Sequence, residues 1–434
     1  MSHAQFNLKS IAQLPKVTWA RGSYLYDADG KQYIDGSGGP AVYCIGHGNA
    51  EVNEAISKQL ERIAHGYRYN FTSDALEELT EIIARRCGGS LQHMIFLTGG
   101  SEAVESCLKL ALQFQHAIGQ KSRRKFIARE RSWHGNTLGA LGVSGFLERR
   151  LAFEGAFIDA VRISPVNAYR PEPDALNAQH LEDAILHEGR ENIAAFIFEP
   201  VVGAAGGCVP APDGYAKRVR EICTKHGVLM IADEVMCGAG RTGTWRALAQ
   251  DGVEPDIMAV AKGLAAGYLP LGAAIYSNKI ADTIGVAQTG HTFTGHTACC
   301  AAGVAVQKIV AREKLVERVA ANATTFKSML ADALAGVEAI GDIRGRGYFL
   351  AAELVQNQSS RQPYAAELKL ALKIRAQAIE NGLICYPVAG NVDGVNGDVV
   401  ILAPSYNVTE DELGEIVEKT ARSIKQVLKH ASLM

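Results

Sequence analysis

Short apolar runs alternate with amphipathic stretches through most of the chain. The amphipathic stretches have apolar residues at every third or fourth position and predict helices from Ser101 to about Ile118, after Gly135, and from Gly214 to Lys225. The apolar runs predict buried strands at residues 94–97, 125–128, 194–198, 228–232, 257–261 and 272–276. Because strands and helices alternate, we expect a mainly parallel sheet covered on both faces.

The two ends of the chain follow other patterns. Val17 to Asp35 alternates apolar and polar residues around a turn at residues 27–30, which predicts a small hairpin in an accessory lobe. Helical periodicity follows at residues 52–64 and 73–86. Beyond a long helix from about Gly303, we expect a separate α+β lobe with strands near 343, 349–354, 383–386 and 399–402 and helices at 364–381 and 410–429. The predicted domains are residues 1–50, which join the small lobe, the large domain 51–302, and the C-terminal small domain 303–434.

Composition narrows the class of protein. The 434 residues include 44 Lys and Arg against 46 Asp and Glu, and the basic residues are dispersed, which argues against nucleic acid or an anionic membrane as a partner. No apolar run approaches the roughly 20 residues that span a bilayer, and residues 1–5 lack the pattern of a signal peptide. We therefore expect a cytoplasmic protein. Nine cysteines without a C-x-x-C pair suggest neither a disulfide framework nor a zinc site.

Two predicted strands end in ionisable residues. The run 228–232 is followed by Asp233 and Glu234, and the run 257–261 is followed by Lys262. The carboxyl ends of parallel strands meet at the edge of the sheet where ligands bind. A desolvated lysine is a nucleophile toward carbonyls and can form a Schiff base, and an aspartate opposite a pyridine nitrogen makes that ring an electron sink. The pair indicates a pyridoxal phosphate site. On these residues alone, a solvated lysine beside a turn glycine remains an equal alternative.

Other strand ends carry weaker candidates. Gly100 and Ser101 stand where a strand meets a helix, so their amides could hold a phosphate, although this stretch in isolation favours Ser101 as a simple N-cap. Trp133 could stack on a planar cofactor and His134 could donate or accept a hydrogen bond near it, or both could belong to a surface turn. Glu199 ends another strand before a proline, where a buried structural carboxylate is as good an explanation as a catalytic one.

Together these stretches resemble the class III, omega-type aminotransferases of fold type I. The likeness extends over nearly the whole chain and includes Gly46-His47-Gly48 near the start and Gly345-Arg346-Gly347 in the C-terminal lobe. Its main motifs are Thr98-Gly99-Gly100-Ser101-Glu102-Ala103, Trp133-His134-Gly135, Glu199-Pro200, Asp233-Glu234-Val235, Gly238-Ala239-Gly240-Arg241-Thr242-Gly243 and Ala261-Lys262-Gly263-Leu264.

The resemblance implies a large domain with a mostly parallel seven-stranded sheet covered by helices, and a smaller α+β lobe formed by the N- and C-terminal segments. It implies pyridoxal 5'-phosphate as cofactor, with Lys262 bonded to it and later carrying the proton, and with Asp233 paired with the pyridine nitrogen. Val235 and Trp133 would pack on the two ring faces.

The phosphate would be held by Gly100 and Ser101 of one subunit and by Thr292 of its neighbour, which implies a homodimer with shared active sites. Thr292 lies in a hydroxyl-rich run, residues 291–296, that could otherwise be an ordinary polar loop.

Three departures from the family pattern concern the substrate. Trp133 replaces the more usual Tyr or Phe, Ala239 replaces the usual Phe, and residues 401–403 lack the arginine that many members place just before the proline, here Pro404. We therefore expect an amine or omega-amino acid as donor and a keto acid or aldehyde as acceptor. A racemase, aminomutase or lyase on the same fold remains an alternative, because all of them use the same electron sink.

Overall fold

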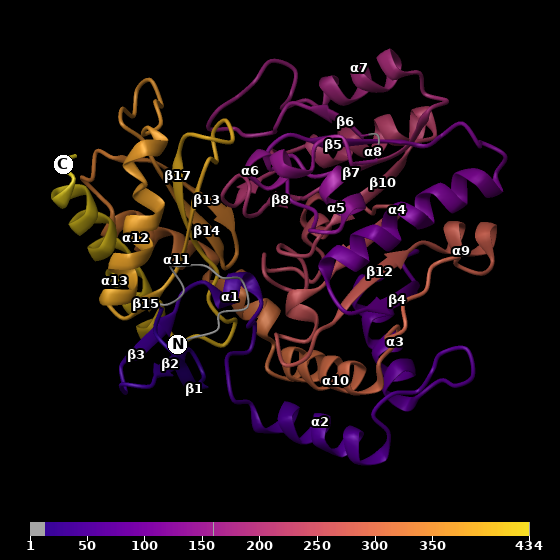
Figure 1. Ribbon diagram of the computed structural model, residues 1–434, viewed down its shortest axis with the longest axis horizontal. Helices are drawn as coiled ribbons and strands as arrows, with labels where there is room; N and C mark the ends of the chain where they lie inside the picture. Colours follow the sequence, from indigo (N-terminus) through magenta and orange to yellow (C-terminus); the bar gives the residue numbers. More distant parts are fainter. Residues whose placement is uncertain (1–13, 159, 434) are drawn as a thin grey trace.

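The molecule consists of a large sheet-containing part and a smaller lobe (Figure 1). The structure is a computed structural model that describes residues 14–158 and 160–433. The large sheet has seven strands in the order β4-β12-β11-β10-β7-β5-β6. Their bounds are β4 His93–Leu97, β5 Lys125–Arg129, β6 Ala160–Ile163, β7 Ile193–Phe198, β10 Leu229–Asp233, β11 Ile257–Val260 and β12 Gly272–Tyr276. Only β12 runs antiparallel to its neighbours, so the expectation of a mostly parallel seven-stranded sheet is confirmed.

Helices cover both faces of this sheet, as its sequence pattern requires. Leu229 and Ile231 belong to the apolar cluster beneath helix α4, whereas Met230 and Ala232 belong to the cluster on the opposite face. The helices of this part are α2 Ala50–Arg62, α3 Asp74–Cys87, α4 Gly100–Ala117, α5 Leu138–Gly142, α6 Leu147–Arg150, α7 Gln179–Glu188, α8 Tyr215–His226 and α9 Asn278–Ile284. The helix expected after Gly135 is only five residues long.

The small lobe is built on a second sheet. Its strand order is β13-β14-β17-β16, with β13 Ile340–Arg346, β14 Phe349–Leu354, β16 Tyr386–Ala389 and β17 Asp398–Leu402. Its helices are α11 Leu315–Ala333, α12 Leu370–Glu380 and α13 Glu410–His430, and α10 Thr297–Arg312 connects it to the large sheet. Helix α10 begins six residues before the expected Gly303, and α12 begins at Leu370 because a separate turn, Ala366–Leu368, precedes it.

The N-terminal strands join the C-terminal segment. Strands β1 Val17–Arg21, β2 Tyr24–Asp27 and β3 Gln32–Asp35 form the expected antiparallel hairpin region, and β15 Leu383–Ile384 pairs parallel with β3. Strand pairing therefore brings together segments that lie about 350 positions apart in the chain.

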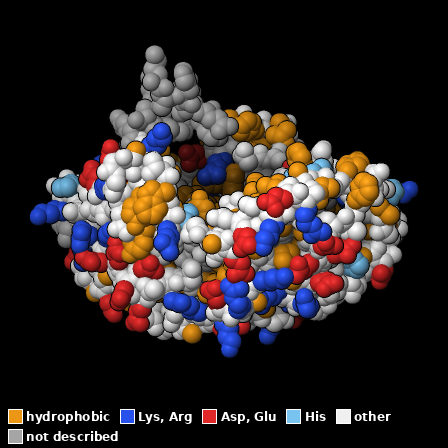
Figure 2. All heavy atoms as spheres, turned by 90° about the horizontal axis from the view of Figure 1, so that it is seen from below, with side chains coloured by type: hydrophobic (Ala, Val, Ile, Leu, Met, Phe, Trp, Pro, Cys, Tyr) orange, Lys and Arg blue, Asp and Glu red, His pale blue; other side chains and the backbone are white. Residues whose placement is uncertain are grey.

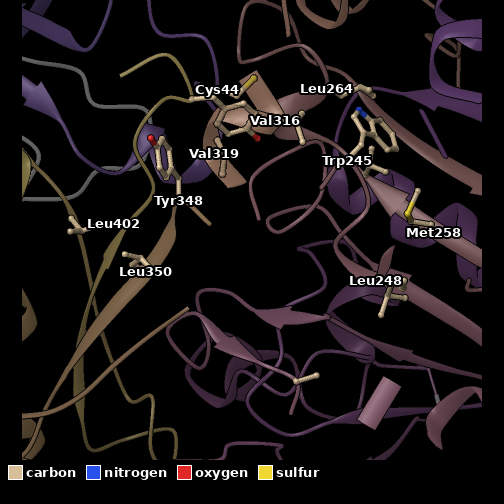
Figure 3. Close-up of a cluster of buried hydrophobic side chains, with 14 of the residues drawn as sticks. Cys44, Trp245, Leu248, Met258, Leu264, Val316, Val319, Tyr348, Leu350 and Leu402 are labelled. Carbon is tan, nitrogen blue, oxygen red and sulfur yellow. The ribbon is translucent and has the colours of Figure 1, made fainter. Parts of the chain in front are cut away.

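Apolar and polar contacts fix the small lobe against the large sheet. Figure 3 shows one buried cluster to which Val319, Tyr348 and Leu402 contribute together with Trp245 and Met258. Arg344 adds hydrogen bonds to the carbonyls of Gly206 and Gly207, at 2.8 and 2.7 Å. The surface is hollowed between the two parts of the molecule (Figure 2).

The face of the molecule in Figure 2 carries side chains of both signs of charge. Lysine and arginine side chains are interspersed with aspartate and glutamate on the face in Figure 2. None of the helices among residues 14–158 and 160–433 is both long and apolar enough to cross a membrane. The expectation drawn from residues 1–5 lies outside the described residues.

Candidate active site

The carboxyl ends of the parallel strands converge on one pocket of about 360 Å³. Glu199 directly follows β7, Asp233 is the last residue of β10, and Lys262 lies two residues after the end of β11, so parallel pairing brings these side chains together. Eight of the nine predicted site residues line this pocket: Gly100, Ser101, Trp133, His134, Glu199, Asp233, Val235 and Lys262. The ninth, Thr292, does not.

Lys262 follows β11 in a strained conformation. Its φ of 45° lies in the left-handed region, which costs a residue with a side chain free energy and is concentrated at functional sites. Burial lowers the pKa of the Lys262 amine to about 8, and the negative charges of Asp233 and Glu199 oppose that shift without cancelling it. The amine is therefore neutral, and nucleophilic, much closer to physiological pH than an exposed lysine.

Asp233 is held by a histidine from a neighbouring strand end. Its Oδ2 lies 2.8 Å from His134 Nδ1, and its Oδ1 accepts a hydrogen bond from the amide of Val235 at 3.0 Å. Both Asp233 and His134 are 3% exposed. Sequence reasoning placed the two residues at one site but did not find this bond, because 99 positions separate them. The carboxylate thus has a fixed orientation inside the pocket.

Glu199 acts on the backbone of the site. Its carboxylate accepts hydrogen bonds from the amides of Trp133 at 2.9 Å and Gly203 at 2.8 Å. Burial raises the pKa of this carboxyl. Because the side chain is 3% exposed and already bonded to two amides, it fixes the turn that carries Trp133.

The start of α4 provides the expected anion-binding end. Gly99 occupies the N-cap position without a side-chain cap, and Ser101 lies in the first turn, so the alternative of Ser101 as a simple N-cap is wrong. Ser101 Oγ instead accepts from the amide of Asn136 at 3.0 Å. A Cβ on Gly100 would lie 2.9 Å from Val235 Cγ1, so only glycine allows this close approach. The first amides of a helix, with its positive dipole end, attract a phosphate.

Thr292 lies in an exposed turn outside the pocket of its own chain. The segment is fixed beside α4, because the amide of Gly295 donates to the carbonyl of Phe96 at 3.1 Å and His291 lies 3.6 Å from Glu102. Its hydroxyl is therefore available to another molecule rather than to this pocket.

Much of the remaining wall comes from loops that sequence reasoning missed. These residues show no helical or strand periodicity, so the pattern of the chain did not mark them. They are Val42, Met236, Gly267, Leu269, Pro270 and Leu271, whereas Thr98, Gly99, Gly135 and Ala261 belong to the recognised motifs and were not singled out as site residues.

The arrangement fits pyridoxal phosphate. An amine of lowered pKa, a carboxylate fixed by His134, an apolar side chain at Val235 and an aromatic one at Trp133 surround the space next to the start of α4. His134 Nε2 is buried and has no hydrogen-bond partner among the described residues, so it remains available to a bound group. The lining thus offers a side chain or backbone group suited to each of a ring nitrogen, a ring face, a carbonyl carbon and a phosphate.

Comparisons with known proteins agree with this chemistry. The family model "Aminotransferase class-III" matches residues 9–424. An uncharacterized aminotransferase of Schizosaccharomyces pombe is 38% identical over 423 residues, with 94% of this chain and 92% of that protein covered. The crystal structure of a transaminase from the marine bacterium Virgibacillus has 31% identity and a TM-score of 0.91, with 96% of this chain and 94% of that chain covered.

A third relative bears on the cofactor. The omega-transaminase of Pseudomonas jessenii in complex with PMP has 28% identity and a TM-score of 0.91, with 100% of this chain and 97% of that chain covered. The resemblance that the motifs indicated is confirmed, and the chain belongs to the class III aminotransferases, enzymes of fold type I that depend on pyridoxal 5'-phosphate.

Proposed function

We propose that this enzyme moves an amino group from an amine or omega-amino acid to a keto acid or aldehyde, in two half-reactions that share one site. The observation that carries the proposal is the position of Lys262 in the same pocket as the hydrogen-bonded pair Asp233 and His134. One group supplies a nucleophilic amine and the other a fixed negative charge, which are the two requirements of cofactor-assisted amino transfer.

Each residue has a part in this scheme. When bound, pyridoxal phosphate supplies a reactive carbonyl carbon and an electron-withdrawing ring. Lys262 Nζ would hold that carbon covalently and, in its free form, would take the proton from the substrate carbon that bears the amine. Asp233 keeps the ring nitrogen protonated, and His134 keeps Asp233 oriented. A base that works near neutral pH suits this proton transfer, and the lowered pKa of Lys262 supplies one.

The walls of the pocket position the ring and the phosphate. Val235 and Trp133 line the pocket and would enclose the two ring faces, and the amides of Gly100 and Ser101 would hold the phosphate. Because Glu199 binds the amide of Trp133, its carboxylate keeps the aromatic wall in place.

We also propose a homodimer in which Thr292 completes the phosphate site of the other subunit. Thr292 is exposed, and Phe293 beside it exposes 52% of its surface. Tyr69 and Phe71 are 70% and 68% exposed. Large apolar side chains exposed to this degree support a face that another protein molecule covers.

Reduction with borohydride followed by peptide mass mapping tests the assignment of Lys262. We expect the cofactor on the peptide that contains Lys262 and none on the Lys262→Ala protein, whereas Lys279→Ala, which changes an exposed lysine of α9, should label normally. Attachment to any other lysine would overturn the assignment. In a parallel assay with an amine donor, keto product should form in proportion to acceptor consumed. Product formation without an acceptor would favour a lyase.

A further inference from the structure

An arginine with no acidic partner lies beside the pocket wall. Arg149 belongs to the short helix α6, and its guanidinium carbon lies 4.4 Å from the ring centroid of Trp133 and 4.9 Å from that of Phe146. Its side chain is exposed, and no carboxylate among residues 14–158 and 160–433 pairs with it. Two aromatic rings thus hold a free cation in one place next to a residue that lines the pocket.

Among the described residues, the pocket lining offers a substrate no cation besides Lys262. The charged residues of its lining are Glu199, Asp233 and Lys262, and the proposed function already uses all three. A carboxylate on the substrate therefore needs an arginine or lysine from outside this lining.

Other arginines near the site do not line the pocket. Arg241 is 1% exposed and donates to backbone carbonyls of the small lobe. Arg68 donates to a backbone carbonyl at 3.0 Å and does not line the pocket. Arg131 faces the loop of the small lobe, where a Cβ on Gly394 would lie only 2.6 Å from its Nη1. Arg129 also contacts a pocket residue, but it is 1% exposed and donates to the backbone carbonyl of Glu199, so Arg149 is the exposed candidate among these arginines.

A stacked guanidinium is well suited to bind an anion. Stacking on an aromatic face leaves the N–H groups at the edge of the guanidinium free, and their planar fork matches a carboxylate. Trp133 would separate this cation from the reacting atoms, so the bound carboxylate belongs to the end of the substrate far from its amine.

We propose that Arg149 is a specificity-determining residue that binds the distal carboxylate of an omega-amino acid whose amine reaches Lys262. This inference rests on the proposed function, because it concerns the substrate of the same pocket. It assigns the preferred donor to the omega-amino acids, with simple amines as weaker donors that lack this contact.

Paired substrates test the proposal. We would measure kcat and KM of the loaded enzyme for 4-aminobutyrate, 5-aminovalerate and 6-aminohexanoate and for the amines of equal length without a carboxylate. In Arg149→Gln, kcat/KM for the best amino acid should fall by about 10-fold to 100-fold, the range for one hydrogen-bonded charge. The loss should lie mainly in KM, because this contact is the same in the ground and transition states. The matched amine should change by less than about 2-fold.

Controls separate this role from others. Arg149→Lys should recover part of the affinity, and Arg190→Gln, at an exposed arginine outside the pocket lining, should change neither substrate. An equal loss for amine and amino acid would show that Arg149 only positions Trp133 and would overturn the proposal. So would a wild-type enzyme that accepts the amines but none of the amino acids. A wild-type enzyme that transfers no amino group from either class would instead refute the proposed function.

Discussion

Asp233→Asn removes one negative charge and leaves the shape of the side chain almost unchanged. In the wild-type protein, Asp233 Oδ2 lies 2.8 Å from His134 Nδ1, and Oδ1 accepts from the amide of Val235 at 3.0 Å. An asparagine oxygen still accepts from Val235, but the amide NH2 now faces the histidine. The variant therefore keeps the local backbone and loses the carboxylate that would hold the cofactor's ring nitrogen protonated.

The substitution should affect folding stability much less than it affects kcat. A hydrogen bond to a charged group contributes about 1.5–3 kcal/mol and a neutral one about 0.5–1.5 kcal/mol, so the weaker contact to His134 costs about 1 kcal/mol of folding stability. Removing a buried charge also removes its desolvation cost, which offsets part of that loss. Catalysis should suffer more, because one preorganised electrostatic contact is typically worth about 100-fold to 1,000-fold in kcat.

The assay compares three quantities in the same preparations: kcat with a saturating amine, cofactor occupancy by absorbance, and unfolding in denaturant. Asp256→Asn is the matched control, because Asp256 binds Arg220 at 2.7 Å and the amide of Met230 at 2.8 Å just before β11 begins, outside the pocket lining. That control should lose stability and keep kcat. If Asp233→Asn bound the cofactor fully and kept kcat within about 5-fold of wild type, far less than the expected electrostatic loss, the assigned role would be wrong.

The remaining predictions concern pH, assembly and the acceptor. Because burial lowers the pKa of Lys262 to about 8, the folded protein releases this proton at lower pH than the unfolded chain. The rate of covalent cofactor attachment to cofactor-free protein should therefore rise with pH and level off above about 9, and a rise that continues past pH 10 would contradict the shifted pKa. Thr292→Ala and Lys262→Ala protomers, each inactive alone, should regain activity when mixed, and confirmed heterodimers without activity would refute a shared site. Pyruvate should serve at least as well as α-ketoglutarate in kcat/KM, because no arginine among the described residues lines the pocket, and a clear preference for α-ketoglutarate would direct attention to Arg149 and Arg68 outside the lining.

The pattern of apolar residues in the sequence predicted those strands and helices whose side chains contact the core at regular intervals. Leu229 to Asp233 alternates between two apolar clusters, and Ile257 to Val260 is buried throughout, so both strands were recognisable from apolar runs alone. Once these strands pair in parallel, the positions of Asp233 and Lys262 at one edge follow from the geometry of the sheet. That is why eight residues drawn from distant motifs could be placed in one pocket.

Contacts between loops could not be predicted in this way. The bond from His134 to Asp233 and the bonds from Glu199 to backbone amides depend on side-chain orientations that no local periodicity specifies. The apolar wall at Leu269 and Leu271 comes from an irregular segment, which carries no pattern at all. Nor did the dispersed basic residues reveal that Arg149 stacks on Trp133, since that contact depends on how α6 folds back over the turn.

The conformation of Lys262 links the large sheet to the helix that leads into the small lobe. A lysine in the left-handed backbone conformation persists only where neighbouring residues fix its backbone. Here those residues lie on several elements. Gln307 of α10 is fully buried and donates to the carbonyls of Gly263 and Leu264 at 3.2 and 3.1 Å, while its own oxygen accepts from Trp245 at 3.0 Å. These bonds fix the turn directly after Lys262. The amine of Lys262 is therefore positioned by its strand on one side and by α10 on the other, so the packing of the two parts of the molecule contributes to the geometry of the candidate site.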